Sequence, residues 1–383
     1  MSDWDGQTHT PRVITGHVVA QTEETRPHEE PVRRPAEERE GGGRSRGTRP
    51  PWVRPSRRRR VARLLALVLC VLLLGGGGTY AWADLELDRS VDLATAASRP
   101  PHGKGTTYLI VGSDSRDGLS EEAKRSLHAG GGGGGRTDSM MLLHTGARGT
   151  TMVSLPRDSW VTLPSYLDPG TGKRHRPARN KLNAAYALGG ARLLARTVEL
   201  NTGLRLDHYA EIGFGGFVGV VDAVGGVDMC VDRNIKDEKS GLDLTKGCHT
   251  LDGGQALAFV RQRHQEAQGD LGRSRNQQKF LAALAHKAAA PGTALNPFRS
   301  YPLLGAALDT LVVDEDMQPR TLVSLFQAMR SVSSGDGRQL NVPVTGREIN
   351  TSKGSAVQWD TAEANKLFTA LRNDRPVSTE QKG

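Results

Sequence analysis

The longest apolar stretch of the chain, residues 64–83, stands apart from the short apolar runs that follow it. A helix of these 20 residues, rising about 1.5 Å per residue, spans a hydrocarbon core of roughly 30 Å. We therefore predict a single-pass transmembrane helix over residues 61–83. Four arginines, 57–60, precede it and acidic residues follow it, which favours a cytoplasmic N-terminus and an extracellular remainder.

A cleaved signal peptide is the alternative interpretation of this stretch. Ala81, Trp82 and Ala83 have the small–x–small form of a signal-peptidase site, and residues 64–74 could form the apolar core of such a signal. The long leader in front and the full spanning length favour a retained anchor. Both interpretations place everything after Asp84 outside the membrane.

Short apolar runs separated by turn residues predict the strands and helices of the remaining chain. A strand, a helix and a second strand within residues 208–231 form a βαβ unit, so we expect a partly parallel sheet and an α/β fold. The predicted strands are 108–111, 140–143, 151–155, 208–212 and 227–231, and the predicted helices are 181–202, 214–224, 255–260 and about 270–289.

Composition distinguishes the tail and the linker from the rest of the chain, and the charge pattern argues against nucleic acid as a partner. Residues 1–60 are rich in Pro, Glu, Arg and Gly, which predicts a disordered cytoplasmic tail, and residues 84–105 form a polar linker. A net charge of +9 suits an anionic partner or membrane surface. Because the basic residues form no dense face with interleaved aromatics, no nucleic-acid binding is expected.

Two of the three cysteines, Cys230 and Cys248, lie 18 residues apart in the exported part. A disulfide is expected in an oxidising compartment and would stabilise the fold by roughly 3 kcal/mol; two unpaired buried thiols are the alternative. Cys70 is an apolar residue of the membrane span. The sequence contains no CxxC or HExxH motif, so a zinc or redox site has no support.

Carboxylates and arginines flank three of the predicted strands. Asp114 and Arg116 follow the first strand, Arg136 and Asp138 precede the second, and Arg157 follows the third. If neighbouring strands pair antiparallel, the start of one and the end of the next meet at the same edge of the sheet. We therefore expect these side chains to gather at one edge.

Further candidates for anion binding follow the helix 255–260. Arg261 and Arg263 would form a two-pronged grip if the chain is extended there. Arg273 and Gln277 lie near the start of the next helix, whose N-terminus favours anions. Arginine binds phosphate oxygens in a bidentate manner, and two carboxylates commonly share one Mg²⁺ with a substrate phosphate. No P-loop or kinase motif is present, and the predicted anchor would suit a phosphoryl donor carried by the membrane.

With these features the chain resembles the LytR-CpsA-Psr (LCP) family. The resemblance covers residues 106–290 in family order, and residues 291–383 resemble the helical C-terminal extension of the family domain. The motifs that carry it are VGSDSR (111–116), RTDSMM (136–141), SLPRDSWV (154–161), KLNAAYALGG (181–190), DHYAEIGFGGFVGVVDAVGGV (207–227), LDGGQALAFVRQR (251–263) and GDLGRSRNQQ (269–278).

The resemblance implies a central mixed β-sheet flanked by helices, in three α/β/α layers. It also implies an Mg²⁺-dependent phosphotransferase that moves an anionic glycopolymer, such as teichoic acid, from a polyprenyl-pyrophosphate carrier to peptidoglycan. The catalytic set would be Asp114, Asp138, Arg136 and Arg157.

The ligand-binding residues follow from the same motifs. Asp114 and Asp138 would hold the Mg²⁺, and one of them would act as base. The polyprenyl chain would pass Phe214, Phe217, Val221 and Phe259. The pyrophosphate would be held by Arg136, Arg157, Arg261, Arg263, Arg273 and Gln277, with Arg116 either joining them or orienting Asp114.

The chain departs from the family pattern in three places. Ala184 stands where His is common, Asn276 stands where Arg is common, and the six glycines 130–135 are an unusual insertion. The rival functions are a pyrophosphatase that uses water as acceptor, a membrane-anchored wall regulator without transfer activity, and a transcriptional regulator. The last would need DNA contact by the first 56 residues, where charges of both signs are mixed.

Overall fold

The computed structural model describes residues 57–94, 99–115, 122, 125, 127, 135, 137–238, 240–262, 270–294 and 296–377. Five predicted site groups lie outside this part of the chain: residues Arg116, Arg136 and Arg263, and the side chains of Asp138 and Arg273.

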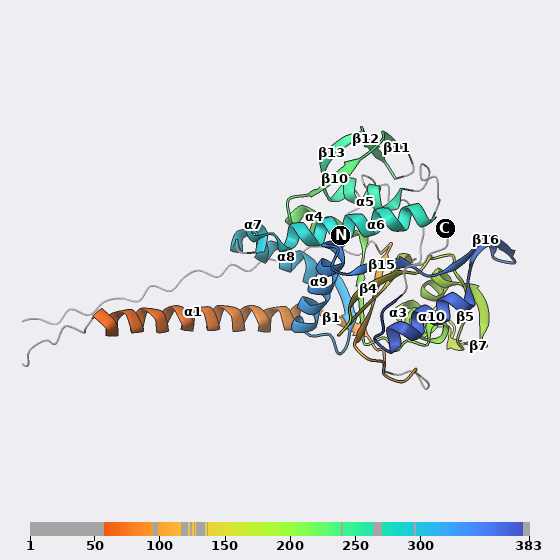
Figure 1. The fold of residues 1–383 in the computed structure, drawn as a ribbon, viewed down its shortest axis with the longest axis horizontal. Coiled ribbons are helices and arrows are strands. Elements are labelled where there is room, and N and C mark those ends of the chain that lie inside the picture. Colours follow the sequence, from red (N-terminus) through yellow and green to blue (C-terminus); the bar gives the residue numbers. More distant parts are fainter. Residues whose placement is uncertain are drawn as a thin grey trace, which may run out of the picture. The chain divides into compact units, whose positions relative to one another are not determined.

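A seven-stranded sheet organises the structure (Figure 1). Its strands, in spatial order, are β1 (Asp88–Val91), β14 (Leu311–Asp314), β9 (His208–Ile212), β2 (Thr106–Ser113), β3 (Thr137–Gly146), β4 (Gly149–Ser154) and β15 (Arg338–Asn341). The pairs β1–β14, β9–β2 and β4–β15 are parallel and the other three are antiparallel. The sheet is therefore mixed, as predicted.

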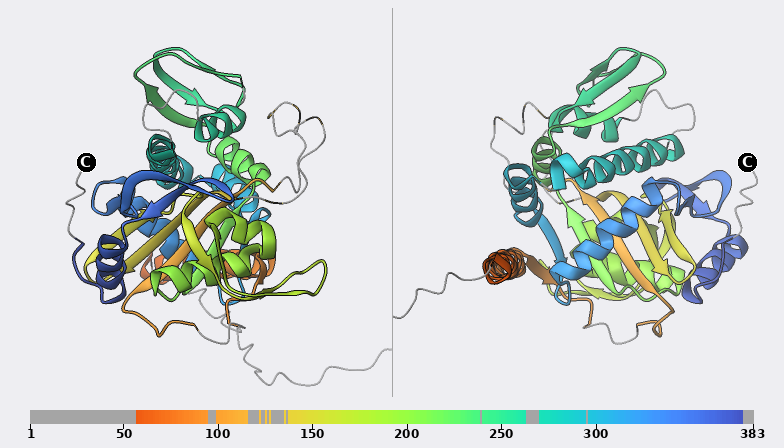
Figure 2. Two further views of the ribbon diagram at one scale, coloured as in Figure 1. Left: turned by 90° about the vertical axis from the view of Figure 1, so that its right-hand side faces the viewer. Right: turned by 60° about the vertical axis from the view of Figure 1, so that its left-hand side comes forward.

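Helices cover both faces of the sheet because its inner strands bury side chains on both sides. In β2, Leu109 and Val111 face α3 (Leu182–Thr202) and α10 (Thr361–Arg372), whereas Tyr108 and Ile110 face α9 (Pro319–Ser333). Figure 2 shows these helices on opposite sides of the strands. The three-layer α/β/α prediction is confirmed.

A smaller core lies beside the sheet, under a β-hairpin. It joins α4 (Phe214–Ala223), α5 (Gly253–Arg261) and α6 (Asp270–Ala289) to β10 (Val227–Val231) and β13 (Gly247–Leu251). Cys230 and Cys248 face each other across β10 and β13 and form the predicted disulfide.

The other elements are short hairpins and connecting helices. The hairpins are β5 (Trp160–Leu163) with β8 (Ala178–Lys181), β6 (Tyr166–Leu167) with β7 (Arg174–His175), β11 (Ile235–Asp237) with β12 (Leu242–Leu244), and β16 (Val344–Thr351) with β17 (Gly354–Trp359). The connecting helices are α7 (Pro291–Ala294) and α8 (Pro297–Leu308).

The predicted βαβ unit is wrong. Strand β10 pairs with β13 outside the central sheet, and the parallel partner of β9 is β2. The burial pattern of β10 gives the reason: Val227, Met229 and Val231 are buried while Asp228 and Cys230 are exposed. One-sided burial is typical of an antiparallel hairpin that covers a core.

Two predicted segments contain strands that the sequence pattern did not indicate. The linker 84–105 includes β1, and the extension 291–383, predicted as helical, contributes β14 and β15 to the central sheet. These strands have only four residues each, too few to show a period of two.

Helix α1 (Arg57–Glu86) contains the predicted membrane segment. Over Val61–Glu86 it is long and apolar enough to cross a membrane. The exposed leucines and valines of this stretch include Leu64, Leu65, Leu67, Val68, Leu69, Val71, Leu73 and Leu74. It is the one such helix in the ranges given above. It is a candidate for a membrane span by length and composition.

Candidate functional site

The carboxyl end of β2 meets the residues that the sequence placed at one edge of the sheet. Ser113 pairs with Thr137 of β3, and Gly112 pairs with Ile212 of β9. On the other side of β3, the backbone nitrogen of Leu155 donates to the carbonyl of Met140 at 2.9 Å. Asp114, the backbone of Asp138 and Arg157 therefore gather at one edge, because β3 is antiparallel to both β2 and β4.

An apolar pocket of about 640 Å³, a volume that includes space open to solvent, lies beside this edge. The sheet supplies one wall and helices α4, α5 and α6 supply the other. Its apolar lining comes from Ile110, Val111, Met141, Ile212, Phe214, Phe217, Leu257, Val260 and Leu281, and its other lining residues are Gly112, Ser113, Ser139, Gly213, Arg261 and Gln277. The lining suits a hydrocarbon ligand with a polar group at one end.

Arg261 is the charged residue of the pocket wall. Its guanidinium carbon lies 4.8 Å from the centre of the Phe214 ring, a cation–π distance, and its Nη1 donates to the carbonyl of Leu127 at 2.9 Å. The backbone nitrogen of Phe214 donates a hydrogen bond of 3.0 Å to the carbonyl of Ser115. Phe214 thus links the turn that carries Asp114 to Arg261.

Local structure explains why Arg261 stands at the end of a helix. A capping box between Asp252 and Gln255 starts α5, and the helix ends at Arg261, after which Gln262 is extended with φ −54° and ψ 136°. The Nε2 of Gln277 donates to the carbonyl of Val260 at 3.0 Å. Gln277 therefore fixes the last turn of α5, in addition to lining the pocket.

A buried glutamate lies behind Asp114, and sequence reasoning missed it. Glu211 of β9 is 5% exposed; the Oη of Tyr186 donates to its Oε1, and the Oη of Tyr209 donates to its Oε2 at 2.6 Å. Burial raises the pKa of Tyr186, and the charges of Glu211 and Asp114 raise it further. A glutamate within the apolar strand 208–212 was the signal, because a buried carboxylate needs hydrogen-bond donors.

Arg157 meets the start of α3, near Lys181 and Asn183. The Nε of Arg157 lies 3.4 Å from Asp158 Oδ2, and Lys181 Nζ lies 2.9 Å from Asp158 Oδ1. The carbonyl of Arg157 accepts a hydrogen bond of 3.0 Å from the nitrogen of Asn183. Because Tyr186 follows one turn later, α3 connects the Arg157 side of the edge to the Asp114 side.

Comparisons with known proteins agree with this fold. The model of the LytR_cpsA_psr family matches residues 84–373. The chain belongs to this family. It is 41% identical over 314 residues to the probable cell wall biosynthesis protein LcpB of Corynebacterium glutamicum, covering 82% of this chain and 70% of the relative.

One further relative supports the family assignment, and one solved structure supports the fold. The chain is 30% identical over 256 residues to the polyisoprenyl-teichoic acid–peptidoglycan teichoic acid transferase TagU of Enterococcus faecalis, covering 65% of this chain and 76% of TagU. The solved LytR-Csp2A-Psr enzyme from Actinomyces oris has a TM-score of 0.56 and 22% identity, and covers 75% of this chain and 96% of that one. The second likeness supports the fold alone.

The structure separates the residues predicted from the family resemblance into three groups. Asp114, Arg157, Arg261 and Gln277 lie at the edge or the pocket described above. Phe214 and Phe217 line the pocket, but Val221 and Phe259 pack in the core under the β10–β13 hairpin. The third group comprises Arg116, Arg136 and Arg263 and the side chains of Asp138 and Arg273, which lie outside the described part of the chain. Their roles stay predictions.

Proposed function

We propose that the protein is an Mg²⁺-dependent phosphotransferase. It moves an anionic glycopolymer from a polyprenyl-pyrophosphate carrier to peptidoglycan outside the membrane. The observation that carries this proposal is the apolar pocket with Arg261 in its wall and Asp114 at the adjoining edge. A polyprenyl pyrophosphate combines the hydrocarbon and the anion that such a site would bind. The names of the relatives LcpB and TagU support the class of reaction.

The residues divide the task by chemistry. Phe214, Phe217 and the other apolar lining residues hold the isoprenoid chain. Arg157 and Arg261, with Arg136, Arg263 and Arg273, neutralise the two phosphates, since guanidinium groups bind phosphate oxygens well. Gln277 and Phe214 keep Arg261 in place.

The oxygen donors at the edge fit a magnesium ion. Asp114 and Asp138 would hold it, and the hydroxyls of Ser113 and Ser115 add only oxygen ligands, the kind that Mg²⁺ prefers. When bound, the ion would offset the negative charge on the pyrophosphate. The described side chains contain no group of three or more His, Cys, Asp and Glu residues arranged for a metal, so substrate oxygens and water would complete the shell.

The proposed reaction exchanges one bond to phosphorus for another. A peptidoglycan hydroxyl attacks the phosphorus that carries the glycopolymer, and polyprenyl phosphate leaves. Asp114 or Asp138 accepts the proton of that hydroxyl, and the arginines stabilise the charge on the leaving phosphate. The protein would be a single-pass cell-membrane protein, with the arginines 57–60 on the cytoplasmic side and this site outside.

The test uses the purified full chain in nanodiscs with a polyprenyl-pyrophosphate-linked glycan and peptidoglycan. We expect glycan phosphate to become linked to peptidoglycan, with loss of activity in EDTA and recovery on adding Mg²⁺. The Arg261→Ala, Arg263→Ala double variant should be inactive. Arg192→Ala is the matched control, because Arg192 is an exposed arginine paired with Asp92 away from the pocket. Full activity of the double variant would refute the site assignment.

The rival functions predict other outcomes of the same assay. A pyrophosphatase releases free glycan phosphate without acceptor, at a rate that added peptidoglycan leaves unchanged. A membrane-anchored regulator without transfer activity shows no turnover with or without Mg²⁺. A transcriptional regulator binds DNA through residues 1–56, which lie outside the described part.

A further inference from the structure

We propose that helix α8 lies in the outer interface of the lipid bilayer, beside the end of α1, with Phe298 and Tyr301 as its anchors. The proposal depends on α1 crossing the membrane. It does not depend on the transfer reaction.

The first observation is the unequal burial of the two halves of α8. Phe298 is 89% exposed and Tyr301 is 48% exposed, and the two residues lie one turn apart on the same face of the helix. In the second half of α8, Leu303, Leu304 and Leu308 pack against the cores of the domain. An exposed phenylalanine and an exposed tyrosine one turn apart, on a helix whose second half packs on the domain, indicate a binding surface.

The second observation is the neighbour of this face. The Oη of Tyr301 and the Oγ1 of Thr79 share a hydrogen bond of 2.6 Å, and the Tyr301 ring lies 6.4 Å from the Trp82 ring. A Cβ placed on Gly305 would lie 3.9 Å from Trp82. Figures 1 and 2 both show α8 beside this last part of α1.

The order of these contacts sets the direction of α8. Tyr301 lies beside Thr79 and Trp82, and Gly305, one turn later, lies beside Trp82. The two helices therefore run in the same direction along this contact. Phe298 comes one turn before Tyr301, so along this contact it lies on the side of the apolar stretch that precedes Thr79 in α1.

The residue types identify lipid as the occupant. Tyr80, Trp82 and Tyr301 form an aromatic group at the end of the candidate span, where tyrosine and tryptophan commonly meet lipid headgroups. Phe298 lies on the apolar side of this group. The exposed Arg299 beside it can reach an anionic headgroup. Because the face continues the surface of α1, whatever surrounds the end of α1 also contacts α8.

The contact would also set the position of the pocket. Helix α8 packs on α4, since a Cβ on Gly219 would lie 3.8 Å from Ala306, and a Cβ on Gly216 would meet Thr310, two residues after α8 ends. The same helix α4 carries Phe214 and Phe217 in the pocket wall. An anchored α8 therefore holds this wall next to the membrane.

Depth-dependent fluorescence quenching in the full chain tests the proposal. Phe298→Cys in a Cys70→Ser background receives an environment-sensitive fluorophore, while the Cys230–Cys248 disulfide stays intact. The protein is reconstituted in vesicles of phosphatidylglycerol and phosphatidylethanolamine. Some vesicles carry nitroxide-labelled lipids, and iodide is the aqueous quencher.

Two reference positions make the measurement decisive. Leu69→Cys reports the middle of α1, and Leu167→Cys reports an exposed leucine of β6, on the opposite side of the sheet from α8 (Figure 1). We expect the label at 298 to be quenched by nitroxide lipid several-fold more than the label at 167, and to be protected from iodide. Thermal unfolding should match the parent chain, because Phe298 is exposed.

Three results would overturn the proposal. Equal lipid quenching at 298 and 167 would place α8 in water. Protection from iodide without lipid quenching would assign the surface to a protein partner or a second copy of the chain. Absence of lipid quenching at position 69 would show that α1 does not cross the bilayer, so that no bilayer would lie beside α8. Each of these results leaves the transfer assay of the proposed function unaffected.

Discussion

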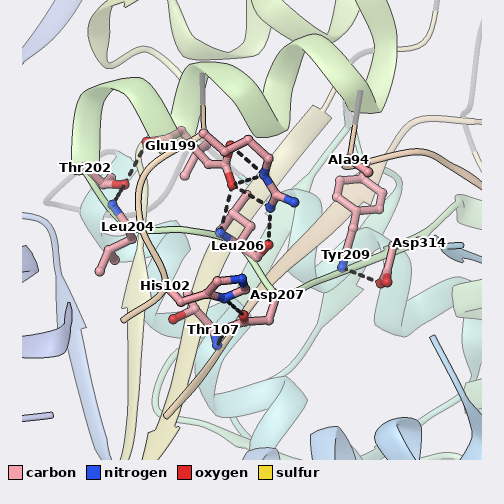
Figure 3. A network of polar contacts seen from close by, with 12 residues as sticks. Ala94, His102, Thr107, Glu199, Thr202, Leu204, Leu206, Asp207, Tyr209 and Asp314 are labelled. Carbon is pink, nitrogen blue, oxygen red and sulfur yellow. Dashed lines mark hydrogen bonds and ion pairs between the residues drawn. The ribbon is translucent and has the colours of Figure 1, made fainter. Parts of the chain in front are cut away.

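At the amino end of β2, the backbone nitrogen of Thr107 donates to Asp207 Oδ2 at 2.8 Å. Close by, Arg99 Nη2 lies 2.7 Å from Glu199 Oε1, and the same oxygen accepts from the nitrogen of Leu206 at 2.9 Å (Figure 3). At the carboxyl end of the same strand, Asp114 stands beside an apolar pocket with Arg261 in its wall.

The two ends of the strand thus use the same residue types for different purposes. At the amino end, carboxylates and an arginine join α3, β2 and β9 to one another. At the carboxyl end, Asp114 stands beside a space that a ligand can enter, and Arg261 lines that space. Charge at a strand end is therefore not diagnostic of function; the neighbouring cavity makes the difference.

Replacing Asp114 and Asp207 in separate variants should distinguish the roles of the two ends of β2 most strongly. Asp114→Asn should lower transfer activity by about 100-fold or more, since a positioned general base commonly contributes about 10²–10⁴-fold to the rate. Its unfolding midpoint should stay close to that of the parent. Asp207→Ala should instead lower the free energy of unfolding by about 1.5–3 kcal/mol, because it removes a charged acceptor of a backbone hydrogen bond.

Activity per folded molecule and chemical denaturation measure both effects. If Asp207→Ala lost activity while keeping its stability, this would contradict the inference that the amino end of β2 supports only the fold.

The buried ion pair at the amino end gives the largest expected effect on stability. Glu199→Ala should lower the free energy of unfolding by about 3–5 kcal/mol, because Arg99 would stay buried without its carboxylate. Replacing both residues, as Arg99→Met with Glu199→Met, should recover part of this loss. Urea titration of the three proteins tests this order, and a double variant less stable than Glu199→Ala would contradict it.

The sequence predicted the position of the described residues at the end of β2 better than it predicted the pairing of the strands. Asp114, Arg157 and Arg261 follow or end regular elements, so their place at one edge follows from strand direction and helix length. The partner of β10 depended on a contact 20 residues away with β13, which no local pattern encodes. Strands β14 and β15 join the sheet from the far end of the chain through short segments.

The lipid residues show the same limit on a finer scale. Phe214, Phe217 and Val221 share one apolar helix whose sequence is hydrophobic almost all round. Only the packing of α4 against the hairpin decides that Val221 faces the core while Phe214 and Phe217 face the pocket. Glu211 was missed because Tyr186, one of its two tyrosine partners, comes from α3, whereas Tyr209 is in the same strand as Glu211.

The two tyrosines that bind Glu211 provide a smaller and more local comparison. Tyr186→Phe and Tyr209→Phe should each lower the free energy of unfolding by about 1.5–3 kcal/mol, since each removes a hydrogen bond to a charged group. Tyr186 also lies within electrostatic reach of Asp114, whereas Tyr209 is fully buried in the core. Transfer activity should therefore fall further in Tyr186→Phe.

Denaturation and the transfer assay on the two matched variants test this expectation. Equal activity in both would mean that Glu211 supports the fold without influencing the Asp114 side.

The smallest effect concerns pH and comes from the amino end of β2. His144 pairs with Thr107 across β2 and β3, and burial lowers its pKa, although the charges of Asp374 and Asp207 act in the opposite direction. The unfolded chain, whose histidine pKa is about 6.5, therefore binds a proton at a higher pH than the folded chain does. Folding stability from this residue is complete above that pKa and is lost as the pH falls through it toward the lower folded pKa.

The variant His144→Gln should accordingly show a smaller drop in unfolding midpoint between pH 7.5 and pH 5.5 than the parent. Thermal unfolding at both pH values measures the difference, with His249→Gln as the control because His249 lies at the surface of the β10–β13 hairpin. An unchanged pH dependence in His144→Gln would mean that Asp374 and Asp207 offset the burial of the imidazole. The amino end of β2 would then tolerate a charged histidine as well as it holds its carboxylates.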